Sequence, residues 1–278
     1  MNEQVKQLLK IELPEQRSPG WHKMRHNMVT ASDFGSVLNN NKYSSRKAVL
    51  KNKCGLGKPF RGNKFTQWGV KYEEIATKLY EKLYQVEVIE FGCIPHPKYS
   101  FLGASPDGIT KDGTMLEIKV PYSREFKEND VPPHYYDQMQ GQLEVCDLNV
   151  CDFMQCKIEE YNNEDEYFKD DVKYKGSVIE YKDADFNLKY LYSDFCMDKE
   201  KFIKWKCGRM ITLGNKNLKI HKITFWKVIK YTIDKVDRQV DWMEISLPEF
   251  DKFWKEVLYY REHLDELETK KKEIKLNI

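Results

Sequence analysis

The chain has 278 residues, a length that fits one large domain or two small ones and suffices for a substantial core. Charged residues make up 32% and aromatic residues 13%, a balance typical of folded globular proteins that argues against a disordered chain. The formal net charge of +2 does not identify a nucleic-acid partner, so any basic surface must come from segregation of charges.

No stretch approaches the ~18 consecutive apolar residues of a membrane span, so no membrane partner is expected. The first residues lack the basic start and apolar run of a signal peptide. Seven cysteines, an odd number without close pairs, are typical of a reducing, intracellular compartment. Cys146, Cys151 and Cys156 recur every five residues, but iron–sulfur clusters usually need four ligands with closer pairs. We therefore interpret them as small core residues.

The N-terminal part predicts short helices. Residues 2–11 have the spacing of an amphipathic helix. A second helix is predicted to begin at Ser18-Pro19, with the serine as N-cap and the proline as first residue. Trp21 and Arg25, four residues apart, would share one face of it.

A third short helix would be capped by Thr30 or Ser32, which leaves its first-turn amides free to hold an anion. Arg25 with Ser32 could therefore form a phosphate-binding site; the alternative is a surface arginine beside an ordinary cap. Residues 44–54 predict a basic helix, followed by a flexible loop over 54–62.

Residues 65–84 form the clearest helix, with apolar side chains at the spacing of a buried stripe. Its two adjacent acids differ in their neighbours. Glu74 shares a side of the helix with Lys71 and Lys78, which indicates that Glu74 faces solvent. Glu73 lies beside small residues at the margin of the stripe, where a carboxylate needs a partner or a metal. Glu73 is therefore the functional candidate.

The stretch 103–120 combines an acid in a turn with a hairpin. Asp107 follows a proline, and an Asp-Gly pair then signals a tight turn before the strand at 115–120. Alternation puts Glu117 and Lys119 on one face of that strand and the apolar residues on the other. Such a break in a core-like strand indicates a functional site. The alternative is an edge strand with a surface ion pair.

Further strands are predicted at 86–94, 99–102, 150–158 and 177–181, the last of them an edge strand, and one or two more over 219–235. Further helices are predicted to begin at Pro132-Pro133, to span 185–206, and to span 248–268, where Phe250, Phe253, Trp254, Val257 and Leu258 would point inward. An acidic loop is predicted at 159–166 and a frayed tail at 270–275. In the helix after Pro132, Gln138 and Gln142 share a face next to the core contacts. Arg124 lies in a mobile segment, 121–127.

Neither an internal repeat nor a long linker divides the chain. The sequence therefore predicts a single domain over 1–278, with a core at about 18–182 and a C-terminal extension at about 183–278. The fold class is α/β (α+β), with a central mixed β-sheet flanked by helices.

The predicted order of elements brings Glu73, Asp107, Glu117 and Lys119 toward one site. Carboxylates are hard oxygen ligands that suit Mg²⁺ or Mn²⁺. Such ions activate water for attack on a phosphodiester and stabilise the leaving oxygen. Lys119 would orient the water or neutralise developing charge. Without a metal, clustered acids would raise one another's pKa, so the sequence predicts a divalent-metal site.

The segment Ser105-Pro-Asp-Gly108 followed by Leu116-Glu-Ile-Lys119 resembles the Asp…Glu-x-Lys signature of the PD-(D/E)xK nuclease superfamily. More narrowly, the chain resembles the lambda-exonuclease / YqaJ-type viral recombinase family of alkaline exonucleases, including homologues from large eukaryotic DNA viruses. The resemblance covers residues 18–158. Its blocks, in the family's order, are Trp21 and Arg25 with 29–32, then 68–73, the signature itself, 122–126, and 135–140.

The resemblance also implies roles for individual residues. The metal ligands would be Asp107, Glu117 and the Ile118 carbonyl, with Glu73 as accessory acid, Lys119 as catalytic lysine and Gln138 as active-site glutamine. The 5′-phosphate and DNA contacts would be Arg25, Ser32, Arg124 and Trp21. The spacing between Lys119 and Arg124 is one residue shorter than in the phage enzyme. The cofactor would be Mg²⁺, with two ions allowed and Mn²⁺ able to substitute.

By the same resemblance, we expect a restriction-endonuclease-like core and a 5′-to-3′ exonuclease on double-stranded DNA. It would leave 3′ single-stranded tails for recombination, repair or viral genome processing. Expected partners are 5′-phosphorylated duplex ends, a single-strand annealing protein and further copies of the chain, as in the trimeric phage enzyme. Expected locations are the host cytoplasm or a viral factory, with the nucleus as an alternative. The alternative functions are a structure-specific endonuclease and a non-catalytic DNA-end-binding protein.

Overall fold

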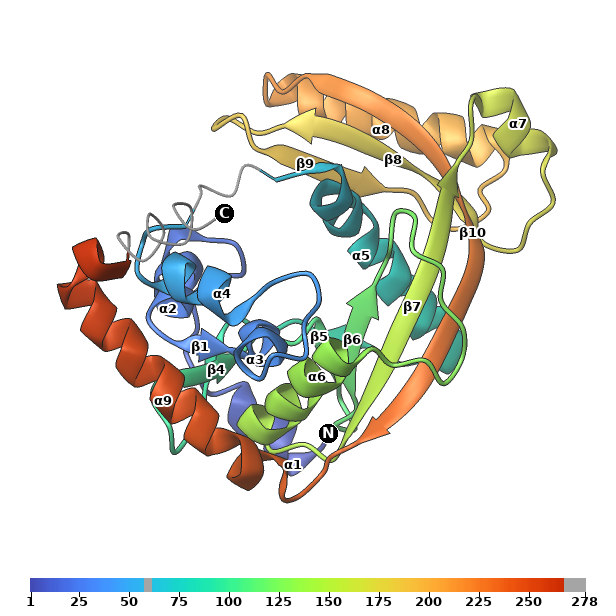
Figure 1. Ribbon diagram of the computed structural model, residues 1–278. Coiled ribbons are helices and arrows are strands. Elements are labelled where there is room, and N and C mark those ends of the chain that lie inside the picture. The colour runs from blue at the N-terminus through green and yellow to red at the C-terminus, as the bar shows by residue number, and fades with distance from the viewer. Residues whose placement is uncertain (58–61, 268–278) are drawn as a thin grey trace, which may run out of the picture.

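The computed structural model describes residues 1–57 and 62–267, and within these the strands form one seven-stranded mixed sheet and one three-stranded sheet (Figure 1). The large sheet has the order β2-β5-β6-β7-β10-β8-β9, and the small one β1-β4-β3. The strands are β1 Val29–Thr30, β2 Val88–Ile89, β3 Ile94–Pro95, β4 Leu102–Ala104, β5 Gly108–Thr110, β6 Met115–Lys119, β7 Val150–Glu160, β8 Lys175–Lys182, β9 Leu188–Tyr192 and β10 Ile220–Asp237. The predicted fold class is confirmed.

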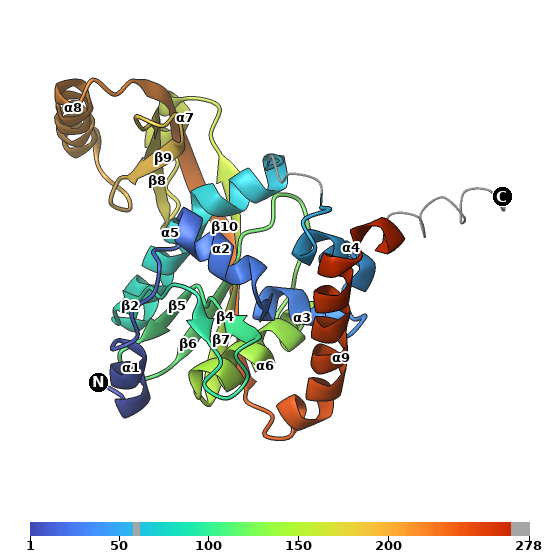
Figure 2. The ribbon, with the colours of Figure 1, turned by 90° about the vertical axis from the view of Figure 1, so that its left-hand side faces the viewer.

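The helices flank this sheet and connect its strands. They are α1 Glu3–Leu8, α2 Pro19–His26, α3 Ala31–Val37, α4 Arg46–Lys53, α5 Lys64–Tyr84, α6 Pro133–Cys146, α7 Glu164–Lys169, α8 Lys199–Asn215 and α9 Trp242–Glu262. Figures 1 and 2 show α7 and α8 at one end of the molecule and α9 at the other, with β10 running between them.

Alternation along β6 divides the core between the two faces of the sheet. Leu116 and Ile118 pack into a cluster with the apolar stripe of α5. Met115 packs into a second cluster that includes Met139 and Leu143 of α6. The cysteines expected in the core, Cys146, Cys151 and Cys156, are buried and unpaired. Glu117 and Lys119 therefore project on the α6 side of the sheet.

Helices α3 and α6 cross at unusually close range. A Cβ on Gly141 would lie 2.2 Å from the ring of Phe34, so only glycine fits there. The same Phe34 ring stacks on Phe250 of α9, with ring centroids 4.3 Å apart. This packing fixes α3, and with it Ser32, against the helix that carries Gln138.

The first helices begin where the sequence predicts. Ser18 caps α2 and accepts a hydrogen bond from the Trp21 N–H (3.2 Å). Thr30 is the N-cap of α3, and its N–H donates to Asp33 (3.1 Å). The β5–β6 hairpin also forms as predicted, and Gly113 in its turn has a φ of 97°, a conformation that favours glycine.

Two strand predictions in the middle of the chain need correction. The single strand expected over 86–94 is instead two short strands, β2 and β3, which belong to different sheets. The strand expected over 99–102 begins only at Leu102, because His96 accepts hydrogen bonds from the Lys98 and Tyr99 N–H groups and holds the preceding residues in a turn.

The helix predicted over residues 185–206 is confirmed only from residue 199 onward, and the part before it was wrong. Residues 188–192 form strand β9, and the helix, α8, begins only at Lys199, where Asp198 caps it by accepting from Lys201 N–H (2.8 Å). Because β9 pairs with β8, β8 is an inner strand rather than the predicted edge. The predicted acidic loop contains the start of α7, capped by Asn163.

The C-terminal helix begins earlier than predicted, and its buried face is slightly displaced from the predicted one. Buried Trp242 and Met243 extend α9 six residues before Pro248, since they pack into the same core as Phe34. Leu258 is exposed because it follows buried Val257 by one residue, about 100° around the helix. Part of the loop predicted at 54–62 and the tail predicted at 270–275 lie outside the described residues.

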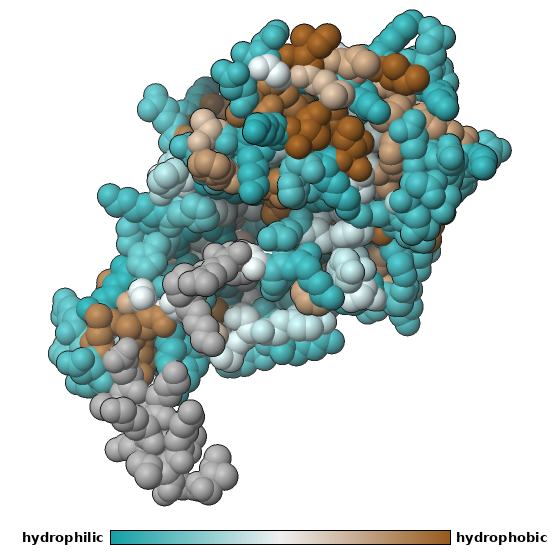
Figure 3. Space-filling model, turned by 90° about the horizontal axis from the view of Figure 1, so that it is seen from above, coloured by the Kyte–Doolittle hydropathy of each residue, from teal (hydrophilic) through white to brown (hydrophobic). Residues whose placement is uncertain are grey.

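Helix α8 leaves apolar side chains uncovered. Figure 3 shows apolar residues gathered over this helix, where Ile203, Met210 and Ile211 are exposed. Their spacing places them on one face of α8. Among the helices of residues 1–57 and 62–267, none is long and apolar enough to cross a membrane.

Candidate active site

The two strands of the hairpin bring the predicted acids together. Gly108 pairs with Leu116 in antiparallel register, so Asp107 lies opposite Glu117. One oxygen of Asp107, Oδ2, accepts a hydrogen bond from the Ile118 N–H (2.7 Å). This bond fixes the carboxyl group over the end of β6, beside the two charged residues of that strand.

Glu117 is fully buried, with an exposed fraction of 0%, and its carboxylate is surrounded by donors. Lys119 forms an ion pair with Oε1. Gln138 also donates to Oε1 (2.7 Å), and Gln142 donates to Oε2 (2.8 Å). Because β6 lies between β5 and β7, the alternative of a surface ion pair on an edge strand is wrong.

Charge interactions within this cluster are strong. Burial raises the pKa of Asp107 well above its ordinary value, and the nearby carboxylates of Glu117 and Glu73 raise it further. Burial alone would lower the pKa of Lys119, but the charges of Glu117 and Asp107 outweigh it and raise that pKa. Lys119 is therefore a fixed cation at neutral pH.

Glu73 approaches the cluster from α5. Its side chain is 34% exposed, in line with the predicted margin position, and pairs with Arg17 (Nη2 to Oε1, 3.0 Å). Partial burial raises its pKa, which Arg17 and Lys119 oppose. Glu74 faces solvent and pairs with Lys78, as predicted. Lys71, which was predicted on that same solvent side, is instead buried.

A second cluster surrounds the guanidinium of Arg25. It donates to Ser32 Oγ (2.7 Å) and to Ser105 Oγ (3.2 Å), and it lies 4.5 Å from the ring centroid of Trp21. The Trp21 indole N–H also donates to Ser105 Oγ (3.3 Å). The structure thus brings three of the predicted DNA-contacting residues together: Trp21 and Ser32 both lie against Arg25.

Ser105 also connects the two clusters. Its carbonyl accepts from Gln142 (3.4 Å), the same side chain that holds Glu117. Ser105 precedes Asp107 by only two residues in the loop between β4 and β5. The loop that carries Asp107 therefore also contacts the arginine cluster, through Ser105.

Arg124 lies apart from the arginine cluster. Its guanidinium donates to Gln155 (2.6 Å) and lies 5.9 Å from the ring centroid of Tyr135. Lys119 lies over the same ring, at 5.1 Å. Arg124 is thus a neighbour of Lys119, and within the described residues it makes no contact with Arg25.

The donor set fits a divalent cation. Asp107 Oδ1 accepts no hydrogen bond from the described residues, and burial together with the neighbouring Glu117 carboxylate raises the pKa of this acid, which a cation would oppose. In the described part of the chain, no group of three or more His, Cys, Asp or Glu side chains forms a metal site by itself. Mg²⁺ commonly binds through one or two carboxylates and completes its shell with water and substrate phosphate oxygens.

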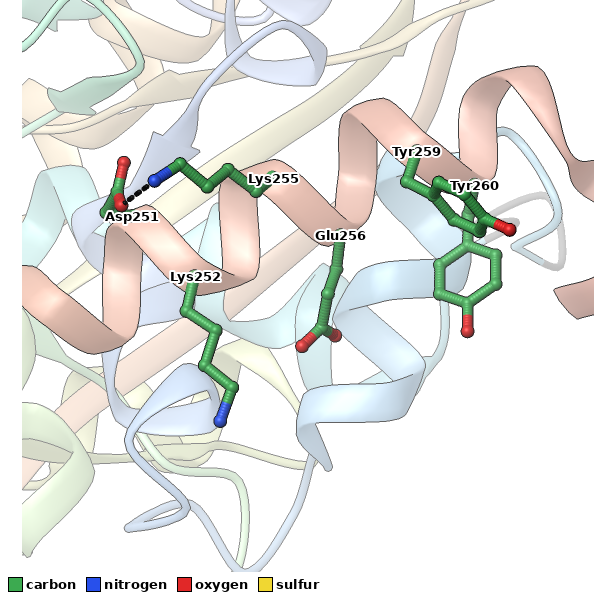
Figure 4. A pocket seen from close by; sticks show the side chains of 6 residues that line it. All are labelled: Asp251, Lys252, Lys255, Glu256, Tyr259 and Tyr260. Atoms are coloured by element: carbon green, nitrogen blue, oxygen red, sulfur yellow. Dashed lines mark ion pairs between the residues drawn. The ribbon is translucent and has the colours of Figure 1, made fainter.

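A surface hollow on α9 lies away from these clusters (Figure 4). Its lining comes from one helix alone: Asp251, Lys252, Lys255, Glu256, Tyr259 and Tyr260. Since its lining comes from one helix and includes no residue of the two clusters, we do not regard the hollow as a catalytic site.

Comparison with known proteins agrees with the resemblance seen in the sequence. Residues 20–149 match the family model of the YqaJ-like viral recombinase domain. This part of the chain is similar to a YqaJ-like viral recombinase domain. It contains every residue of both clusters except Arg17, so the two clusters lie within or beside the family's own domain.

One of two viral relatives is similar to this chain well beyond the YqaJ-like domain. The chain is 32% identical to Uncharacterized protein R354 of Acanthamoeba polyphaga mimivirus over 311 aligned residues, 96% of this chain and 57% of that protein. It is 32% identical to Protein D345L of African swine fever virus over 161 residues, 47% of this chain and 46% of that protein. The chain thus spans about half the length of the curated relatives it matches.

The fold is also that of a solved enzyme. The alkaline exonuclease LHK-Exo from Laribacter hongkongensis superposes with a TM-score of 0.55 at 19% identity, covering 91% of this chain and 99% of that one. The same enzyme in complex with dAMP gives a TM-score of 0.53. At this identity the similarity concerns the fold, and it extends beyond the YqaJ-like domain into the C-terminal region.

Three residues of the site were not predicted. Gln142 is one helical turn after Gln138, and this spacing could have identified it as a second donor to Glu117. Ser105 stands next to the signature's proline, but nothing in the sequence connects it with Arg25. Arg17 has a φ of 65° in the loop before α2, and no local pattern relates it to Glu73.

Proposed function

We propose that the chain is a nuclease that uses Mg²⁺ or Mn²⁺ to degrade duplex DNA from its 5′ ends, leaving 3′ single strands. The observation that carries this proposal is the buried Glu117 carboxylate opposite Asp107 and beside Lys119, connected through Ser105 to Arg25. Acids, a fixed cation and an anion-binding arginine are the groups that phosphodiester hydrolysis at a phosphorylated end requires.

Each residue of the acid cluster would have a separate task. Asp107 and Glu117 would hold the cation with the Ile118 carbonyl, and Glu73 would be the accessory acid at the margin. A bound ion would supply Lewis-acid activation of water and stabilisation of the leaving oxygen. Lys119, being charged, would donate a hydrogen bond to the attacking water or to the phosphate rather than act as a base.

The glutamines would act through Glu117. Gln138 and Gln142 each donate to a different oxygen of this carboxylate, and so fix its rotamer. An oriented carboxylate presents its remaining lone pairs in one direction, which supports a metal site of defined geometry. Gln138, the family's expected active-site glutamine, would thus be a positioning residue.

Polarity would come from the arginine cluster. A terminal phosphate would bind at the Arg25 guanidinium and the Ser32 hydroxyl, beside the ring of Trp21. Arg124, which lies near Lys119, would contact the DNA closer to the acid cluster. Ser105, which contacts Arg25 and precedes Asp107 by two residues, would keep the terminal phosphate near the acids, so that cleavage begins at the 5′ end.

The C-terminal region would belong to the same nuclease unit. Strand β10 lies between β7 and β8 in the large sheet, which supports a single domain over residues 1–278. The 3′ strands produced would be substrates for an annealing protein, and a ring of several copies, as in the phage enzyme, would favour continuous digestion.

Arg25→Ala is expected to abolish the preference for 5′-phosphorylated ends. Hydrogen bonds to a charged group contribute about 1.5–3 kcal/mol, so the rate on phosphorylated duplexes should fall roughly 10- to 150-fold. The rate on 5′-hydroxyl duplexes should change much less. Initial rates on the two substrates measure this ratio.

Lys23→Ala, an exposed basic residue of the same helix, is the control and should preserve the preference. If Arg25→Ala cleaves both substrates as fast as the unmodified protein, the proposed recognition of the 5′ phosphate by Arg25 is contradicted. The structure-specific endonuclease is then the better description.

A further inference from the structure

Three aromatic residues at the start of α5 and after β6 form an exposed cluster, which we call the aromatic platform (Phe65, Trp68 and Tyr122). The Phe65 and Tyr122 side chains are 51% and 44% exposed. The Tyr122 ring lies edge-on to Phe65 and to Trp68, with ring centroids 5.7 Å and 5.1 Å apart. Single exposed aromatics are ordinary, but a cluster of them marks an interaction surface.

Lys64 gives the rim of the platform a positive charge, and the N-cap of α5 orders the backbone that carries Phe65. The Lys64 ammonium lies 5.1 Å from the ring centroid of Phe65 and 4.9 Å from that of Tyr122. Asn63 caps α5 by accepting from the Phe65 and Thr66 N–H groups (2.9 and 3.0 Å), which orders the turn that carries Phe65. A cation beside aromatic rings is the combination that binds phosphate and base of one nucleotide.

Chain connectivity places the platform next to the acid cluster. Trp68 precedes Glu73 by five residues on the same helix, a rise of about 8 Å. Tyr122 follows Lys119 by three residues, at most about 11 Å of chain. A DNA strand held at Lys119 therefore has its neighbouring nucleotides within reach of the platform.

We propose that the aromatic platform stacks unpaired bases of the DNA strand that enters the active site. Bases inside a duplex stack on one another and hide their faces, so only separated bases could engage these rings. Stacking accepts every base, which suits digestion that does not depend on sequence. The substrate class rests on the nuclease function proposed above; the stacking surface itself rests on the exposed rings and Lys64.

The test uses a duplex whose 5′-terminal bases are replaced by the fluorescent adenine analogue 2-aminopurine and left unpaired. It is mixed with the full chain in EDTA, so that cleavage does not occur. Stacking on the platform should quench the fluorescence. Phe65→Ala and Tyr122→Leu should abolish most of the quenching and weaken binding roughly tenfold, since stacking of a base contributes about 1–3 kcal/mol.

Two variants serve as controls. Tyr122→Phe should retain quenching because it keeps the ring, whereas leucine keeps only bulk. Tyr84→Ala, also half exposed but near the other end of α5, should leave quenching and binding unchanged. Thermal unfolding of each variant verifies that it is folded.

Three results would contradict the proposal, and they differ in whether they also contradict the proposed nuclease function. Quenching that persists in Phe65→Ala and Tyr122→Leu overturns the platform. DNA that is bound and digested without any quenching overturns the platform and leaves the nuclease function standing. A protein that neither binds nor digests DNA in Mg²⁺ overturns both.

Discussion

Asp107→Asn is expected to lower the rate of DNA hydrolysis by about 10³-fold, the scale seen when a single charge-stabilising group is removed from an active site. Asparagine keeps an oxygen that can accept from the Ile118 N–H, so the loop should stay in place. It removes the negative charge that would balance a divalent cation beside Glu117. Steady-state rates on linear duplex DNA in Mg²⁺ measure the effect.

The matched control for this substitution lies in the same hairpin. Asp112 is exposed in the β5–β6 turn, and its carboxylate accepts a hydrogen bond from the nearby Thr110 hydroxyl. Asp112→Asn should therefore retain nearly full activity. Equal activities for the two variants would show that Asp107 does not bind the metal.

Lys71→Met is expected to reduce the free energy of unfolding by about 3–5 kcal/mol, the usual effect of removing one partner from a buried ion pair. Lys71 is 7% exposed, and its ammonium lies 2.7 Å from Glu160 and 2.8 Å from Glu180. It also donates to the Thr224 hydroxyl (3.1 Å). Methionine fills the same space but leaves Glu180 without the Lys71 cation, and leaves Glu160 with Lys222 at 3.6 Å. Urea unfolding measures the change.

The double variant Lys71→Met, Glu180→Gln should recover part of this loss, since it removes the charge that is left without a cation. Lys78→Met on the same helix is the control, because Lys78 and its partner Glu74 are both exposed. It should change stability by less than about 1 kcal/mol. If Lys71→Met is equally mild, the buried ion network is not what holds α5 to the sheet.

The parts of the site that the sequence predicts are those encoded by neighbouring residues. Alternation along β6 pairs Glu117 with Lys119, and the Asp-Gly turn sets the register that puts Asp107 opposite Glu117. Helical spacing distinguishes Glu73, at the margin of the buried stripe, from Glu74, on the solvent side of the helix. The structure places these side chains together; their roles in catalysis remain predictions that the substitutions above address.

What the sequence does not predict depends on partners far along the chain. Lys71 has the helical position of a solvent-facing residue, but its partners Glu160 and Glu180 lie 89 and 109 residues further on. A hydrophobic period shows which face is apolar and cannot show that an acidic strand will cover a lysine. The placement of β10 between β7 and β8 is likewise decided by long-range pairing.

The erroneous part of the helix predicted over 185–206 has a local cause. Residues 188–192 form a short segment without clear alternation, and they are followed by a strongly helical segment. Pairing with β8 then determines their conformation. A two-stranded contact of this kind overrides weak helical propensity.

The most direct test of the proposed function follows both ends of a linear duplex together with a closed circular duplex, in Mg²⁺ and in EDTA. We predict that a label at a 5′ phosphate is released first, that the 3′ strands persist, that the circle stays intact, and that EDTA stops the reaction. Cutting of the circle, or release of the 3′ label first, would contradict the assignment of a metal-dependent 5′-to-3′ exonuclease.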